Sequence, residues 1–108
     1  MNLDFRIREM LKKLGAPVHL RGYKQMRDLI AIVYENKNYK KIKYSDLYRE
    51  LGEKYGVKAA DRTLRYFVYY IFSQKNNNEY IDKIFGYRST EPSLIEFVEA
   101  IVDELKLQ

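Results

Sequence analysis

The sequence has no cysteine and no long apolar run, and these absences narrow the classes of protein to which it can belong. Without cysteine, neither disulfide bonds nor thiolate metal sites can form. No apolar stretch approaches the ~20 residues that a membrane-spanning helix needs. The charged start, residues 1–9, also lacks the apolar core of a signal peptide. We therefore expect a soluble, cytoplasmic protein with no membrane partner.

Residues suited to catalysis are also scarce. His19 is the only histidine, and a lone histidine without cysteine or clustered carboxylates is poorly suited to bind a metal or activate a nucleophile. We expect it to be structural, capping or hydrogen-bonding a helix junction. No Gly-rich phosphate loop is present, and the carboxylates near the C-terminus are expected to form a solvated helix face. The sequence predicts no enzyme, no metal and no cofactor.

Charge is unevenly distributed along the chain, whose net charge is +5. Residues 1–43 carry 11 Lys/Arg against 4 Asp/Glu, whereas residues 76–108 carry 3 against 7. The pattern predicts a basic side and an acidic end. A basic face favours polyanions, because neutralised phosphates release their counterions. A lysine-rich surface that only keeps a small protein in solution accounts for the same composition.

Apolar residues recur at helical spacing along the 108 residues, and no segment alternates with period two for long enough to form a sheet. We expect an all-α fold of about six helices in a single domain, residues 1–108, with no receiver domain. Helices are expected over about 3–14, 22–35, 45–55, 58–74, 80–85 and 92–107. Ser45 and Asp46 are candidate N-caps of the third helix, and Ser93 with Glu96 matches a capping box for the last.

Residues 44–74 match a helix-turn-helix. A helix that ends at Tyr55-Gly56-Val57 is followed at once by a longer helix over roughly 58–74. Glycine permits the tight turn, and its apolar neighbours can hold the two helices together. Any antiparallel pair of helices can share such a turn, so the pattern alone does not establish DNA binding.

A projection of the longer helix at 100° per residue separates two faces. The face toward the core carries Ala60, Leu64, Phe67 and Ile71, with Val68 on its flank; the opposite face carries Arg62, Arg65, Tyr66 and Tyr69. The arginines occupy the N-terminal half of the helix, where a planar guanidinium can bond guanine O6 and N7 together in the major groove. The alternative is an ordinary solvated face that uses arginine for solubility.

These positions define a candidate DNA interface. We expect the base-reading residues to be Arg62, Arg65 and Asp61, the last accepting from a cytosine amine or orienting Arg65 from the i,i+4 position. The residues expected at the DNA backbone are Lys58, Tyr66 and Tyr69, together with Lys40, Lys41 and Lys43 of a connector that interleaves tyrosine with lysine. A solvated loop explains the connector equally well.

Several short motifs resemble one known family. Leu14 to Tyr23 reads L-G-A-P-V-H-L-R-G-Y, Asp61 to Arg65 reads D-R-T-L-R, and residues 84–87 read I-F-G-Y. In this order they resemble the C-terminal effector domain of the sporulation-initiation response regulator of endospore-forming bacteria. The resemblance extends from about residue 7 through nearly the whole chain.

The resemblance implies a six-helix fold whose helix-turn-helix inserts its second helix in the major groove of double-stranded DNA. It also implies transcription control at short operator boxes, where copies sit head-to-tail on tandem sites. The family's acidic-Arg-x-x-Arg pattern falls on Asp61, Arg62 and Arg65. The chain departs from the family between residues 46 and 61, where its first motif helix looks longer and its turn shorter.

The main alternative function is a protein-interaction module or antagonist that keeps the fold but not operator recognition. In that interpretation, the acidic C-terminal third would contact a basic partner, RNA polymerase or the basic face of another copy. The altered spacing before Asp61 and the Ala59-Ala60 pair favour this alternative.

Overall fold

In the computed structural model, the described part of the chain forms six α-helices and no strand. The structure describes residues 2–36, 38, 41–74, 78–86 and 90–108. The helices are α1 (Leu3–Lys13), α2 (Tyr23–Glu35), α3 (Tyr44–Tyr55), α4 (Ala60–Ser73), α5 (Glu79–Phe85) and α6 (Leu94–Leu107). The predicted all-α class is confirmed.

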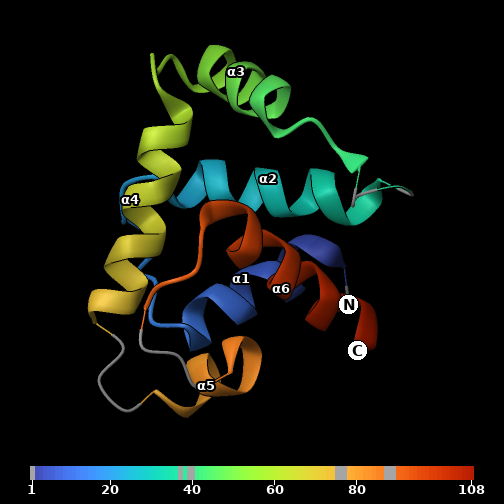
Figure 1. Ribbon diagram of the computed structural model, residues 1–108, viewed down its shortest axis with the longest axis vertical. Coiled ribbons are helices and arrows are strands. Elements are labelled where there is room, and N and C mark those ends of the chain that lie inside the picture. Colours follow the sequence, from blue (N-terminus) through green and yellow to red (C-terminus); the bar gives the residue numbers. More distant parts are fainter. Residues whose placement is uncertain (1, 37, 39–40, 75–77, 87–89) are drawn as a thin grey trace.

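Helix α2 runs through the middle of the molecule and contacts α1, α3, α4 and α6. Figure 1 shows α3 on one side of α2, with α1 and α6 on the other, while α4 crosses one end of it. Helix α5 packs against α6. The two chain ends lie together, because the Arg6 guanidinium on α1 donates hydrogen bonds to the Leu105 carbonyl oxygen and to Gln108 Oε1.

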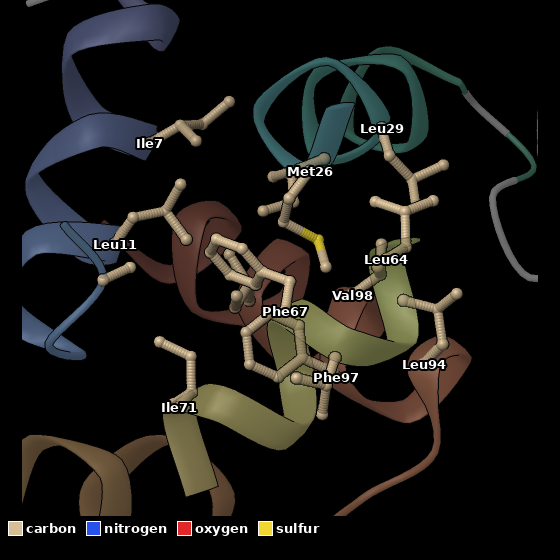
Figure 2. Packing of buried hydrophobic residues seen from close by; sticks show 14 of the residues in the cluster. Ile7, Leu11, Met26, Leu29, Leu64, Phe67, Ile71, Leu94, Phe97 and Val98 are labelled. Atoms are coloured by element: carbon tan, nitrogen blue, oxygen red, sulfur yellow. The ribbon is translucent and has the colours of Figure 1, made fainter. Parts of the chain in front are cut away.

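The core is formed where α1, α2, α4 and α6 converge (Figure 2). Phe67 of α4 and Phe97 of α6 are fully buried. Their rings pack edge to face, with centroids 6.2 Å apart. On α2, the buried residues include Met26, Leu29, Ile30 and Val33. The predicted core-facing positions of α4 are all buried: Ala60, Leu64, Phe67, Ile71 and the flanking Val68. Burial of this stripe sets the rotation of α4 about its own axis, and so decides which side chains it turns to solvent.

The start of α3 differs from the sequence prediction. The helix begins at Tyr44, with Lys43 at the N-cap position, so Ser45 and Asp46 lie within its first turn and neither caps it. The Tyr44 ring is buried, and its hydroxyl lies 3.4 Å from Glu99 Oε2 of α6 as a hydrogen-bond donor. This tertiary contact fixes Tyr44 inside the fold and explains why the helix begins before the residues with good capping side chains.

The predicted starts of α4 and α6 had different outcomes. Helix α4 begins at Ala60 and not near Lys58, because residues 56–59 form the turn that precedes it. The turn is therefore longer than the sequence suggested. At α6 the predicted capping box is confirmed: Glu96 N donates to Ser93 Oγ at 3.1 Å, and Ser93 N donates to Glu96 Oε1 at 2.8 Å.

Candidate nucleic-acid interface

Two glycines shape the junction between α3 and α4. Gly52 is buried in the last turns of α3, where an added Cβ would lie only 2.8 Å from the carbonyl oxygen of Val57. Gly56 ends the helix at φ 68°, in the left-handed region that glycine adopts without steric cost. Together they let the chain turn back closely over α3, an arrangement typical of a helix-turn-helix.

Helix α4 presents one face to the core and the other to solvent, as its spacing predicted. Arg62, Arg65, Tyr66 and Tyr69 are all exposed, and 43% of Tyr66 and 57% of Tyr69 is accessible. Both arginines lie in the N-terminal half of the helix, where the aligned peptide dipoles place about half a positive charge. This end of α4 therefore attracts anions.

The two arginines differ in their surroundings. Arg65 Nη1 donates to Asp61 Oδ2 at 2.8 Å, one helical turn away, although the Arg65 side chain remains 62% exposed. Within the described residues, Arg62 forms no ion pair or side-chain hydrogen bond. The Asp61 carboxylate thus orients Arg65 along the helix, whereas the Arg62 guanidinium is free to bind a ligand.

Tyr48 of α3 lies next to the Asp61–Arg65 pair. Burial raises the pKa of the Tyr48 phenol; the nearby positive charge of Arg65 opposes this effect and the negative charge of Asp61 adds to it. Tyr48 is only partly exposed, so the phenol stays protonated at neutral pH and can serve as a hydrogen-bond donor beside the ion pair.

The partly buried carboxylate of Asp28 on α2 holds the end of α3 by hydrogen bonds. Asp28 Oδ2 accepts hydrogen bonds from the Tyr55 hydroxyl at 2.5 Å and from Lys54 Nζ at 2.7 Å. Both donors lie in the last turn of α3, immediately before Gly56. The contact therefore anchors the end of α3 from which the turn to α4 departs.

The residues predicted at the DNA backbone fall into two groups. Lys58 is exposed in the turn before α4 and lines a shallow hollow with Tyr48, Ala60 and Asp61. Lys41 and Lys43 are exposed and lie just before α3, whose N-cap is Lys43. Lys40 lies outside the described residues. The structure brings Lys58 together with Asp61 at the start of α4, in a hollow that Ser45 of the first turn of α3 also lines; Lys43 directly precedes that turn.

Other residues at this surface were missed by the sequence reasoning. A shallow groove between α3 and the turn is lined by Tyr48, Arg49, Gly52, Val57 and Lys58. The spacing Gly52-x-x-x-Gly56 was the available signal for Gly52, since a small residue one turn before the turn glycine lets the chain pass close to the first helix. Tyr48 and Arg49 gave no sequence signal, because only the packing of α3 on α4 brings them to this surface.

The expected role of His19 is not seen. His19 is exposed in the connection between α1 and α2, and its side chain makes no hydrogen bond to any described residue. It neither caps a helix nor joins two of them. The predicted structural role required a buried or partnered imidazole, and the turn instead directs Leu20 into the core.

In the described part of the chain, no helix is long and apolar enough to cross a membrane. No cluster of three or more His, Cys, Asp or Glu side chains there is arranged to hold a metal ion.

A family model described as "Sporulation initiation factor Spo0A C terminal" matches residues 7–105, nearly the whole chain. The match spans all of α2 to α5, so it includes the turn between α3 and α4 and the exposed face of α4.

Proposed function

The chain belongs to the family of sporulation initiation factor Spo0A C-terminal domains, and we propose that it binds double-stranded DNA sequence-specifically by inserting α4 in the major groove. The family consists of DNA-binding effector domains of sporulation regulators and is not a family of enzymes. The step beyond the family is the assignment of α4, and of particular side chains on it, to base recognition.

The free guanidinium of Arg62 carries this proposal. An α-helix with its side chains is about 10–12 Å wide and the major groove of B-DNA is about 12 Å wide, so α4 can enter the groove along its exposed face. Arg62 lies on that face near the helix N-terminus. Because no ion pair has to be broken, the Arg62 guanidinium can donate two N–H hydrogen bonds, one to guanine O6 and one to N7.

Arg65 and Asp61 act as a unit in this proposal. The 2.8 Å ion pair holds the Arg65 guanidinium toward the first turn of α4, which limits the bases it can reach. Asp61 retains acceptor capacity and can take a hydrogen bond from a cytosine amine. An anionic residue at this place also disfavours misplaced phosphates, so the pair adds selectivity more than affinity.

The DNA backbone contacts are assigned to side chains around this face. Tyr66 and Tyr69 lie one helical turn after Arg62 and Arg65, and Lys58 lies in the turn before α4. These side chains can reach phosphates or sugars without reading sequence. Lys41 and Lys43, just before the start of α3, would add further contacts to the duplex backbone. These contacts fix the register in which α4 meets the bases.

Selection of bound fragments from a genomic library, followed by fluorescence anisotropy on the selected duplex, tests the proposal. We expect a preferred sequence and a steep fall of affinity with salt. The double variant Arg62→Ala/Arg65→Ala should lose the preference for the selected duplex over a scrambled one while its helical circular dichroism is unchanged. Two good arginine–guanine pairs are worth about 1–3 kcal/mol each in discrimination.

The matched control is Lys13→Gln/Lys83→Gln, which removes two exposed cations on α1 and α5. It should retain the sequence preference. A wild-type chain that binds every duplex more weakly than about 10⁻⁴ M would contradict DNA binding and favour the protein-interaction alternative. Unchanged preference in the arginine double variant would show that other residues read the bases.

A further inference from the structure

Two arginines in the described part of the chain have no partner within it, Arg62 and Arg21. The other arginines described are engaged: Arg6 with the Leu105 carbonyl and Gln108, Arg8 and Arg27 with Asp4, Arg49 with Asp46, and Arg65 with Asp61. Arg62 belongs to the proposed recognition face. Arg21 lies in the connection between α1 and α2 and was assigned no role by the sequence.

The fold places Arg21 beside α4. The next residue, Gly22, packs so closely on that helix that an added Cβ would lie 3.0 Å from the Thr63 carbonyl oxygen and 3.2 Å from Thr63 Cγ2. Thr63 directly follows Arg62. Figure 1 shows the same relationship at the level of the chain, with the connection from α1 to α2 passing next to α4. Arg21 therefore directly precedes one residue of the Gly22–Thr63 contact, and Arg62 directly precedes the other.

The connection between α1 and α2 is held by backbone hydrogen bonds and by two side chains buried in the core. Leu20 N donates to the Pro17 carbonyl and Tyr23 N donates to the Leu20 carbonyl, each at 3.0 Å. Leu20 and Tyr23 are both buried in the core. The exposed side chains between and around these anchors, His19, Arg21 and Lys24, are therefore carried on a fixed backbone with no acidic residue among them.

We propose that Arg21, with His19 and Lys24 beside it, binds the DNA phosphate strand that borders the major groove on the α2 side of α4. This inference rests on the proposed function, since it requires α4 to occupy the groove. A helix about 10–12 Å wide fills a groove about 12 Å wide, so structure next to the helix on either side faces a phosphate strand. The α1–α2 connection, which packs on Thr63 of α4, would then face one of these strands.

Arginine suits this position for physical reasons. Its guanidinium bonds phosphate oxygens in a bidentate manner, and an unpaired one gives up no protein contact on binding. Binding a phosphate here releases counterions but reads no base. Arg21 would therefore contribute affinity and register equally on every duplex, while Arg62 and Arg65 contribute preference.

The test is the salt dependence of binding by Arg21→Gln, measured by anisotropy with the preferred and a scrambled duplex. Loss of one phosphate contact reduces the slope of log affinity against log salt by about 0.9, and at about 0.15 M salt this corresponds to an affinity loss of about fivefold. We expect that loss on both duplexes, with the ratio of the two affinities unchanged. Arg21→Lys, which keeps the charge, should recover most of the slope.

Lys83→Gln is the matched control, since it removes one exposed cation on α5, away from the N-terminal half of α4; its slope should equal that of the wild type. If Arg21→Gln has the wild-type slope, or changes it no more than the control does, the assignment of Arg21 is overturned while the proposed function stands. If the wild-type chain itself shows no salt-dependent binding, the proposed function fails and this inference fails with it.

Discussion

Asp61 and Arg65 form an ion pair across one turn of α4, with 2.8 Å between Oδ2 and Nη1, at the helix end where the exposed arginines lie. Because both side chains are substantially exposed, the pair adds little to the free energy of unfolding, about 0–1 kcal/mol. Its effect is to set the direction of the Arg65 guanidinium. The neighbouring Arg62 has no such constraint from the described residues.

Replacement of Asp61 should therefore alter specificity more than stability. We expect Asp61→Ala to reduce discrimination between the preferred and a scrambled duplex by about 1 kcal/mol. Affinity for the scrambled duplex should rise, since a negative charge facing the phosphates is removed. Anisotropy gives both affinities, and thermal unfolding should show little change.

Asp46→Ala supplies the comparison, because it breaks a similar exposed pair with Arg49 on α3, where the N–O distance is 3.1 Å. That variant should keep the discrimination of the wild type. Equal discrimination by Asp61→Ala and the wild type would mean that the Asp61–Arg65 pair plays no part in base reading.

Replacement of Gly52 should disrupt the junction of α3 and α4. A Cβ at this position would lie 2.8 Å from the Val57 carbonyl oxygen, so the turn must shift to admit it. We expect Gly52→Ala to lower the free energy of unfolding by about 1–3 kcal/mol, despite the better helix propensity of alanine, and to weaken binding to the preferred duplex. Urea denaturation measures the first effect.

The adjacent substitution Glu53→Ala, at an exposed position of the same helix, should change stability by less than about 0.5 kcal/mol. A Gly52→Ala variant as stable as this control would show that the turn does not pass against Gly52 as described.

The contact of Asp28 with the end of α3 should make stability depend on acidity. Burial by itself raises the pKa of Asp28, but hydrogen bonds from Lys54 and Tyr55, and the positive charges of Lys54 and Arg27, outweigh it and lower the pKa below its usual value. A carboxylate with a lowered pKa stabilises the fold fully above its unfolded pKa, about 3.9. That stabilisation is lost as the pH falls through the folded value.

We expect Asp28→Asn to lower the free energy of unfolding by about 1–2 kcal/mol at pH 7. This difference from the wild type should shrink below about pH 4. Urea denaturation at a series of pH values measures this. Glu53→Gln, which neutralises an exposed carboxylate on α3, should follow the wild-type curve throughout. A difference between Asp28→Asn and wild type that is constant from pH 3 to 7 would rule out the ionised Asp28 as its source.

The sequence by itself determined which face of α4 would be exposed. Ala60, Leu64 and Phe67 recur at the helical period, and burial of that stripe leaves no choice about where Arg62 and Arg65 point. The Ser93–Glu96 capping box was predictable for a similar reason, because a capping box is formed by residues within one turn of each other. Both features depend only on local geometry.

Tertiary structure decided the features that depend on contacts between distant segments. The packing of Tyr44 against Glu99 moved the start of α3 ahead of its apparent caps, and the close passage of Val57 over Gly52 lengthened the turn before α4. The contact of Gly22 with Thr63 brought Arg21 next to α4. Helical periodicity cannot encode these relationships, since it reports which face of a helix is apolar and not which segment covers it.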